Sequence, residues 1–338
     1  MAVAHALAAC LALLAVLVGG VLGAGAVASL LITLRTEAAF PPAGPFVPVS
    51  GGRLATIEAG PREGARATIV LLHGASANAA EPMEGVGRIL ASQGFRVVSF
   101  DRPGFGWSDR LRGAEAATPA AQGAAIAEAL ERMGVGPAIV LGHSWSGALA
   151  ASLALEHPDR VAGLVLVSPV ALPLPQRQGL PWYWRLALQP PMAWLLSRTV
   201  GPPVAMHYLE GAAHTVFRPQ PVSADYLTRA RAALVLRPAT LLANVQDLIG
   251  LPAALAAQSP RYGAITAPTV IVAGEADPIV RTDLQARPLA ERIPGAEFVV
   301  LPGIGHMVQY VAADVLAREV GRLADRIGER RPLPAAAP

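Results

Sequence analysis

The sequence predicts an α/β protein with a doubly wound, mostly parallel sheet, an apolar N-terminal helix and an inserted helical segment. From residue 51 onward, short apolar runs alternate with Ala- and Leu-rich helical stretches, a pattern typical of β-α-β units. Residues 2–34 contain no Asp, Glu, Lys or Arg. The alternation stops between Pro169 and Tyr262, where prolines and three of the five tryptophans gather. A length of 338 residues fits one large domain with extra segments.

The first segment, residues 1–35, predicts a transmembrane anchor. Its uncharged stretch exceeds the ~20 residues that a helix needs to cross a bilayer. A cleaved signal peptide would begin with basic residues and have an apolar core of about 7–15 residues, and this segment has neither feature. Small residues at 23–26 nevertheless leave cleavage open. We expect a Pro-rich spacer over residues 36–50 to join the anchor to the folded part.

The folded part comprises residues 51–169 and 263–328, and residues 329–338 are expected to be a flexible tail. Its predicted strands are apolar or β-branched runs bounded by turn residues, and its predicted helices lie between them. The strands are expected at Leu54–Ala59, Ala67–Leu72, Phe95–Phe100, Ala138–Leu141, Gly163–Val167, Thr269–Ala273 and Phe298–Leu301. The helices are expected at Met83–Ser92, Pro119–Met133, Ala148–Glu156, Asp283–Arg292 and Ala312–Ile327.

Composition excludes several classes of site. Cys10 is the single cysteine, so the chain can form neither an internal disulfide nor a thiolate metal centre. The net charge is only +3, and no dense basic run precedes the C-terminal tail, which argues against a nucleic-acid partner. We therefore expect no metal and no nucleic acid.

The most informative motif is Leu-Gly-His-Ser-Trp-Ser-Gly at residues 141–147. An apolar strand precedes it and an Ala-rich helix follows it, so Ser144 would stand at the apex of a tight strand-to-helix turn. This is the arrangement of a nucleophile elbow, in which a serine hydroxyl is presented at the carboxyl end of a sheet. Ser146 stands where the usual G-x-S-x-G pattern has its second glycine.

A serine nucleophile needs a base and an orienting acid, and two later loops supply candidates. Asp277 follows the strand Thr269–Ala273, and His306 follows the strand Phe298–Leu301. Glu275 is a rival acid because it lies just past the same strand as Asp277.

These motifs resemble the α/β-hydrolase fold superfamily. The matching segments are LLHGAS (71–76), FDRPGFGWSD (100–109), LGHSWSG (141–147), HPDRVAGLVLVSP (157–169), VAGEADPIV (272–280) and GIGHMVQ (303–309). The resemblance implies Ser144 as nucleophile, His306 as base and Asp277 as its orienter. It also implies an oxyanion hole made by the backbone N–H groups of Ala75 and Trp145, and it implies no cofactor.

The insertion at residues 170–262 lies where this superfamily places a helical cap over the nucleophile. We expect Trp182, Trp184 and Trp194 of the cap, together with His73 beside the oxyanion loop, to contact substrate. Simple packing of a small helical layer explains the tryptophans equally well.

The predicted function is hydrolysis of an ester or related acyl bond through an acyl-enzyme, on a lipophilic small molecule. A serine nucleophile excludes the dehalogenases and epoxide hydrolases of this fold, which need a carboxylate there. Carbon–carbon bond hydrolases, aminopeptidases and cofactor-free haloperoxidases share the Ser triad and stay open. A membrane-tethered binding protein without activity is the alternative from another class. We expect the anchor to lie in a bacterial inner membrane; the side of the membrane and the oligomeric state are not predicted.

Overall fold

The computed structural model describes residues 1–111, 114–173, 186 and 188–329. Its centre is an eight-stranded sheet with the order β1-β2-β4-β3-β5-β6-β7-β8. The two pairs that involve β2 are antiparallel, and every other pair is parallel, as predicted. The strands are β1 (Phe46–Val49), β2 (Gly52–Ala59), β3 (Thr68–Leu72), β4 (Arg96–Phe100), β5 (Ala138–His143), β6 (Val161–Val167), β7 (Thr269–Gly274) and β8 (Glu297–Leu301).

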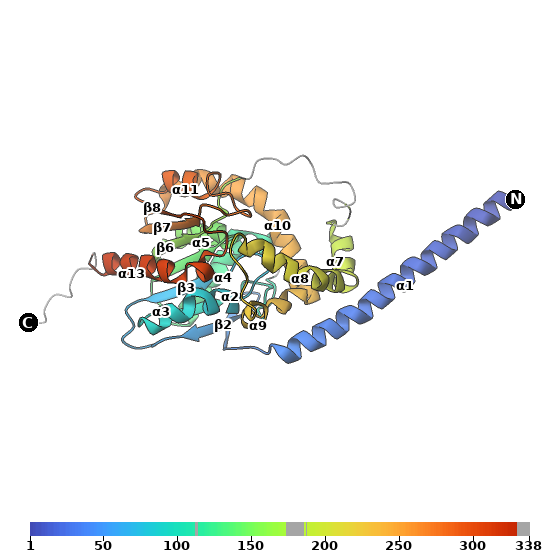
Figure 1. Ribbon diagram of the computed structural model, residues 1–338, viewed down its shortest axis with the longest axis horizontal. Coiled ribbons are helices and arrows are strands. Elements are labelled where there is room, and N and C mark those ends of the chain that lie inside the picture. The colour runs from blue at the N-terminus through green and yellow to red at the C-terminus, as the bar shows by residue number, and fades with distance from the viewer. Residues whose placement is uncertain (112–113, 174–185, 187, 330–338) are drawn as a thin grey trace, which may run out of the picture.

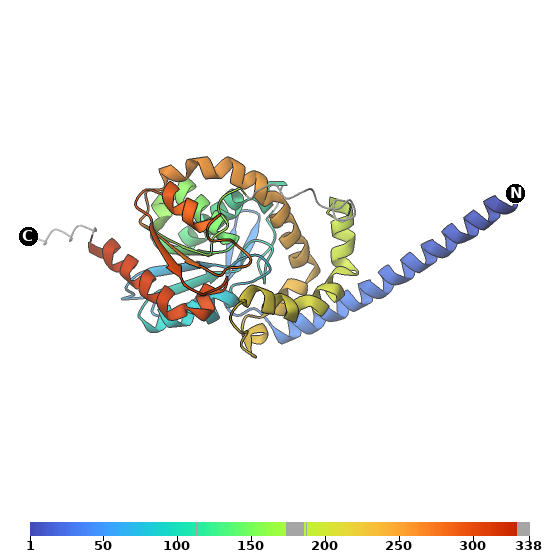
Figure 2. The ribbon, with the colours of Figure 1, turned by 45° about the horizontal axis from the view of Figure 1, so that its top comes forward.

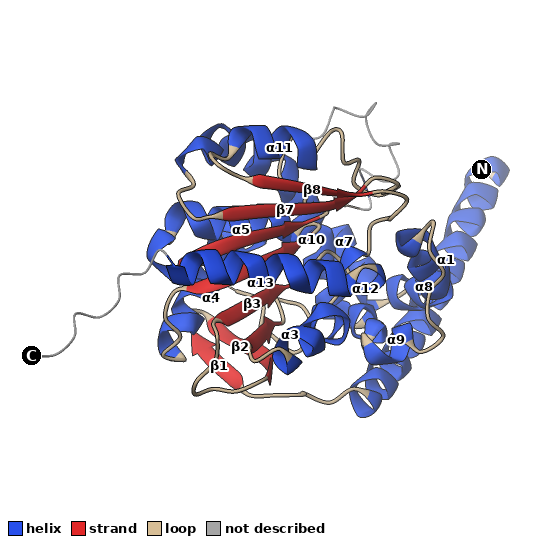
Figure 3. Cartoon of the chain, turned by 60° about the vertical axis from the view of Figure 1, so that its left-hand side comes forward, coloured by secondary structure: helices blue, strands red, loops and turns tan. Residues whose placement is uncertain are grey.

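Helices cover both faces of this sheet (Figure 3). One face packs against α4 (Pro119–Arg132), α5 (Ser146–Glu156) and α11 (Ala286–Arg292). The other packs against α3 (Arg88–Ser92) and α13 (Ala313–Glu329). Both clusters consist of side chains removed from water, so the central strands are apolar on both sides, which a parallel sheet between two helical layers requires.

Short elements complete the core. The helix predicted at Met83–Ser92 is a single stretch whose first part, Met83–Gly87, is a π-helix. The remaining elements are α2 (Ala80–Pro82), α12 (Val308–Val311) and the 3-10 turns Ala114–Ala117, Pro158–Arg160 and Ser259–Ala264.

The predicted spacer over residues 36–50 is partly wrong. The N-terminal helix continues to Ala39, and Phe46–Val49 forms edge strand β1, paired antiparallel with β2. Val47 and Val49 are buried while Pro48 between them is exposed. An edge strand tolerates proline because its outer side makes no ladder hydrogen bonds.

The insertion forms a cap at the end of the sheet that faces α1 (Figures 1 and 2). Its described elements are α7 (Pro190–Arg198), α8 (Gly201–Phe217), α9 (Tyr226–Arg229), the 3-10 turn η4 (Ala232–Leu236) and α10 (Pro238–Gln258). Helix α10 runs back from the cap toward β7 and so ties the cap to the core.

Helix α1 (Ala2–Ala39) projects far from the body of the molecule (Figures 1 and 2). Only its C-terminal part is packed: Gly25, Ser29, Ile32 and Thr36 are buried, and the helix contacts α7, α8 and η4. Among the described helices, α1 and the segment Pro238–Ala264 have the length and apolar composition of a membrane span. The second carries buried polar contacts with the core, described below, and it belongs to the cap.

Candidate functional site

The turn around Ser144 has the strained geometry of an elbow. Strand β5 ends at His143 and α5 begins at Ser146, and Ser144 between them has a positive φ of 53°. Such a backbone costs a non-glycine residue roughly 1–3 kcal/mol and is found where the surrounding structure enforces it. A Cβ on Gly142 would lie 2.2 Å from the carbonyl oxygen of Ser146, so this position accepts only glycine. The turn therefore forces the Ser144 side chain outward.

Ser146 fits the second glycine position because its side chain has a partner. Its Oγ donates a hydrogen bond of 2.5 Å to the carbonyl oxygen of His73, in the loop after β3. The departure from the usual motif thus ties the elbow to the neighbouring loop instead of distorting it.

His306 and Asp277 are brought together from the ends of β8 and β7. His306 Nδ1 lies 2.7 Å from Asp277 Oδ2, and both residues are buried. The other carboxylate oxygen, Oδ1, accepts hydrogen bonds of 2.8 Å from the backbone N–H groups of Ile279 and Val280. Glu275 is exposed, so the geometry pairs the histidine with Asp277 and leaves the rival acid in solvent.

A cavity of about 270 Å³ brings Ser144 and His306 to one space. Gly74, Ala75 and Ser76 of the loop after β3 also line it. Most of its wall is apolar and comes from the cap and the last loops: Leu209, Ala212, Ala213, Val216, Leu227, Ala232, Val235, Ile279 and Met307. Among the described residues, no arginine or lysine lines this cavity, and Glu81 is its one carboxylic acid.

Glu81 and His143, which both line the cavity, belong to one buried chain of polar groups. Gln309 Nε2 lies 2.6 Å from Glu81 Oε1 and 3.1 Å from His143 Nδ1, and His143 Nε2 lies 3.2 Å from the carbonyl oxygen of His306. The contacts are satisfied together when His143 carries its proton on Nε2. Burial raises the pKa of Glu81 to about 7, against a weaker opposing effect of the Gln309 hydrogen bond. Burial also holds the pKa of His143 well below its usual value, so this ring is neutral.

The prediction that His73 contacts substrate is wrong. Its ring is fully buried and does not line the cavity. Nε2 accepts a hydrogen bond from the backbone N–H of Arg102 at 3.0 Å, so Nδ1 carries the proton and donates to the carbonyl oxygen of Gly74 at 2.8 Å. Burial, followed by the nearby Arg102 charge, lowers the pKa of His73 well below its usual value. His73 therefore holds the loop after β3 in shape.

The predicted tryptophan contacts find no support. Trp194 on α7 is 53% exposed and is absent from the cavity wall. Trp182 and Trp184 lie outside the described residues. Of the two predicted oxyanion donors, Ala75 lines the cavity and Trp145 follows Ser144 with its ring buried. Their role as donors stays a prediction.

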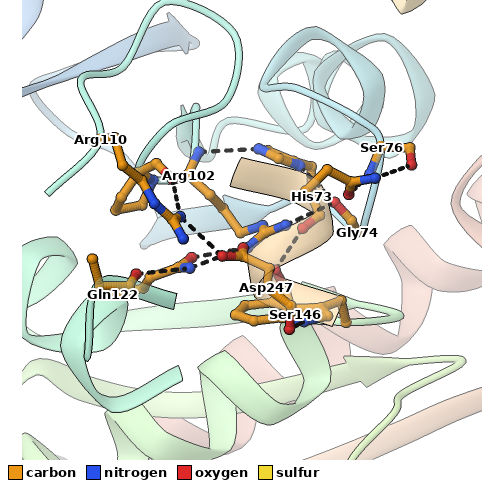
Figure 4. A network of polar contacts seen from close by, with 12 residues as sticks. His73, Gly74, Ser76, Arg102, Arg110, Gln122, Ser146 and Asp247 are labelled. Atoms are coloured by element: carbon orange, nitrogen blue, oxygen red, sulfur yellow. Dashed lines mark hydrogen bonds and ion pairs between the residues drawn. The ribbon is translucent and has the colours of Figure 1, made fainter. Parts of the chain in front are cut away.

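A buried polar network beside the elbow was not predicted (Figure 4). The guanidinium of Arg102 pairs with Asp247 of α10 at 2.7 Å, and Gln122 of α4 donates to the same carboxylate oxygen at 2.9 Å. Arg110 forms an ion pair of 2.9 Å with the other oxygen of Asp247. One signal existed in the sequence, because Asp247 is the single charged residue of α10, and an acidic residue is rarely buried unless it is paired.

Within the described residues, no group of three or more His, Cys, Asp or Glu side chains could hold a metal ion. The reactive side chains at the cavity include Ser144, His306 with its partner Asp277, and Glu81.

Known proteins resemble this chain over most of its length. A 2-hydroxy-6-oxo-6-phenylhexa-2,4-dienoate hydrolase of Burkholderia cepacia is 27% identical over 265 residues, which cover 74% of this chain and 85% of that protein. The structure of Est816, an N-acyl homoserine lactone degrading enzyme, is 26% identical with a TM-score of 0.58, covering 84% of this chain and 99% of that one. A membrane phospholipase A shares the fold over 96% of this chain and 99% of its own, with a TM-score of 0.62 and 22% identity. The profile of the α/β hydrolase fold family matches residues 67–313, and this chain belongs to that family.

Proposed function

We propose that this protein is a serine hydrolase that cleaves a neutral, lipophilic ester or lactone through an acyl-enzyme. The observation that carries the proposal is one apolar cavity lined by both Ser144 and a histidine already paired with a buried carboxylate. A hydroxyl in that setting has the base that it needs to act as a nucleophile.

The reaction follows the triad scheme. Ser144 Oγ attacks the carbonyl carbon while His306 Nε2 takes the hydroxyl proton, and Asp277 stabilises the imidazolium that forms. The backbone N–H groups of Ala75 and Trp145 would receive the oxyanion of the tetrahedral intermediate. The proton on His306 passes to the leaving oxygen. Water then attacks the carbonyl carbon of the acyl-enzyme while His306 takes its proton. That proton passes to Ser144 Oγ as the acid is released.

The lack of cationic side chains along the described wall favours a neutral substrate. An anionic substrate needs a positive partner once it leaves water, because an unpaired buried charge is strongly unfavourable. Three described arginines of the cap have other partners: Arg229 contacts Glu84, Arg231 donates to the Pro41 carbonyl, and Arg237 pairs with Glu37. Glu81 would repel a second carboxylate whenever it is ionised.

Carbon–carbon bond hydrolysis is the second candidate, supported by the relative from Burkholderia cepacia. That relative is named for a dienoate, which carries a carboxylate, and the described wall of this cavity offers no cation for it. Est816, named for a lactone substrate, is the likeness that agrees better with a cavity whose described wall has no cationic side chain.

The experiment compares wild type with Ser144→Ala in two steps. A fluorophosphonate probe should label the wild type and leave the variant unlabelled. Wild type is then assayed on p-nitrophenyl esters of increasing chain length, on an N-acyl homoserine lactone and on 2-hydroxy-6-oxo-6-phenylhexa-2,4-dienoate. Each added methylene that the cavity buries contributes up to about 0.8 kcal/mol, so kcat/KM should rise roughly threefold to fourfold per step until the cavity is full.

Turnover of the dienoate well above that of the esters would replace the proposal by carbon–carbon bond hydrolysis. Labelling or turnover by Ser144→Ala equal to wild type would remove Ser144 as nucleophile. A wild type that neither labels nor turns over any substrate would leave the non-catalytic binding protein.

We also propose that α1 anchors the protein in a membrane. Residues 2–24 are uncharged, exposed but for partly covered Leu22, and about 35 Å long at 1.5 Å per residue, close to the ~30 Å of the hydrocarbon core. From Gly25 onward the same helix packs on the cap, which would hold the cap close to the bilayer surface. The full chain should stay in the membrane fraction after a carbonate wash. A mature N-terminus near Ala26 would instead show a cleaved signal.

A further inference from the structure

We propose that one turn of cap helix α10, through Asn244 and Asp247, positions both backbone donors of the oxyanion hole. Asn244 contacts the loop that carries Ala75, and Asp247 contacts the groups packed on Trp145. The inference rests on the proposed function, since it assigns positioning residues to that hydrolysis.

Asn244 holds the residue that follows Ala75. The backbone N–H of Ser76 donates to Asn244 Oδ1 at 2.9 Å, and Asn244 Nδ2 donates to Ser76 Oγ at 2.9 Å. Ser76 has a positive φ of 58°, which is unfavourable for a serine, so the loop needs such a contact to keep this shape. The orientation of the peptide units around Ala75 therefore depends on the cap.

Asp247 reaches the second donor through Arg102. Both side chains are fully buried, and the guanidinium carbon lies over two rings, 4.1 Å from the centre of Phe105 and 4.0 Å from that of Trp145. The carbonyl oxygen of Asp247 also accepts a hydrogen bond of 3.3 Å from Trp145 Nε1. The ring of the residue after Ser144 is thus fixed from two sides by the cap residue and its partner.

Arg102 links the two halves of this arrangement. Its second terminal nitrogen lies 3.4 Å from the carbonyl oxygen of Gly74, and its backbone N–H donates to His73 (Figure 4). Asn244 and Asp247 are three residues apart on α10, so they face the same side of the helix. A single helical turn therefore contacts both the loop after β3 and the turn after β5, which carry the two proposed donors.

The His306–Asp277 pair has a different support. Asp277 is held by its own loop, through Ile279 and Val280, and it has no hydrogen bond with α10. Loosening the contact between α10 and the loop should consequently weaken stabilisation of the oxyanion while leaving the base and its orienting acid in place. This separates the proposal from a general loss of stability.

The test uses Asn244→Ala in the full-length protein, with Asn244→Asp as the conservative variant and Gln246→Ala as the control on an exposed position of the same helix. Asp at 244 keeps an acceptor for the Ser76 N–H, so it should recover most of the loss. The measurements are kcat and KM for a p-nitrophenyl ester, the pH profile of kcat/KM, and inhibition by a trifluoromethyl ketone, whose adduct with Ser144 places an oxyanion in the hole.

Removing an oxyanion donor outright lowers kcat about 10²–10³-fold, so a misplaced donor should lower it roughly 10- to 100-fold. We expect Asn244→Ala to lower kcat in this range and to raise the Ki of the ketone by the same factor. KM should change by less than about twofold, and the pH profile should keep its shape. Asp247→Asn, which leaves the Arg102 charge poorly compensated, should show the same pattern together with a lower Tm.

Two results overturn the inference. One is an Asn244→Ala variant with kcat and ketone affinity equal to those of Gln246→Ala. The other is a loss of kcat with no loss of ketone affinity, which would place the effect outside the oxyanion hole. With either result, labelling of the wild type by fluorophosphonate leaves the proposed function standing. A wild type that does not react with the probe removes the proposed function and this inference together.

Discussion

Replacing Asp277 by asparagine tests the proposed roles of the acid and the base, because it exchanges one carboxylate oxygen for an NH₂ group. Asp277 Oδ1 accepts two backbone N–H groups, from Ile279 and Val280, and Oδ2 faces Nδ1 of His306. An asparagine has one acceptor oxygen and one NH₂ donor. If the amide oxygen keeps the two backbone groups, the NH₂ must face His306, and the histidine can accept it only with Nδ1 deprotonated.

The magnitude follows from comparing the two orientations of the amide. The reversed orientation would turn the NH₂ donor toward the N–H groups of Ile279 and Val280. Leaving the buried Val280 N–H without an acceptor costs about 1–3 kcal/mol, so the first orientation is favoured. His306 would then carry its proton on Nε2, the nitrogen that has to accept the proton of Ser144. Loss of the correct tautomer lowers kcat about 10⁴-fold in a serine protease triad, and we expect a loss of about 10³–10⁴-fold here.

The assay is kcat on the best p-nitrophenyl ester, with the Tm of each variant as a check on folding. Glu275→Gln is the matched control, because Glu275 follows the same strand but is exposed, and it should retain activity within about twofold. An Asp277→Asn variant within tenfold of wild type would refute the reasoning. A larger loss in Glu275→Gln than in Asp277→Asn would transfer the role to Glu275.

Three further predictions concern burial and local geometry. Burial raises the pKa of Glu81 from 4.5 to about 7, so folding takes up a proton between these pH values and the stability of the wild type falls as the pH rises through them. In urea titrations, Glu81→Gln should therefore gain stability relative to wild type from pH 5 to 8, by at most about 3 kcal/mol. Gly142→Ala should abolish labelling by fluorophosphonate, because its Cβ would meet the carbonyl oxygen of Ser146. A chain beginning at Phe40 should unfold at lower urea than one beginning at Gly25, because it loses buried Ile32, worth roughly 1.5–3 kcal/mol. A stability difference between Glu81→Gln and wild type that does not change with pH would contradict the first prediction. Normal labelling of Gly142→Ala would contradict the second, and equal urea midpoints of the two shortened chains would contradict the third.

The centre of the sheet could be predicted from the sequence because its strands are buried on both faces. A continuous apolar run such as Thr68–Leu72 or Thr269–Gly274 is a strong local signal, and the helices between such runs fix their parallel direction. Strand β1 gives no such signal, since Pro48 interrupts it and its position at the sheet edge is set by pairing with β2. Its existence depends on a partner and could not be read from its own residues.

The pairing of His306 with Asp277 was predictable for a topological reason. Residues that follow neighbouring parallel strands meet at one edge of a sheet, so β7 and β8 bring the two loops together however far apart they are in the sequence. The choice between Asp277 and Glu275 could not be made from the neighbouring sequence, because it depends on which of the two side chains the loop buries. The prediction for His73 failed for the same reason: its place beside the oxyanion loop was correct, but its ring points into the protein and not into the cavity.

The Arg102–Asp247 pair could not be predicted from the sequence around either residue. These residues are 145 positions apart, one in the loop after β4 and the other in the cap, and no motif links them. The physical rule that a buried charge needs a partner predicts only that each has one. The partner is fixed by how the cap sits on the core, and that seating is also what holds the loop of Ala75 and the ring of Trp145. The cap therefore has to be treated as part of the catalytic geometry, because the groups that would bind the oxyanion lie in the core while the contacts that hold them lie in α10.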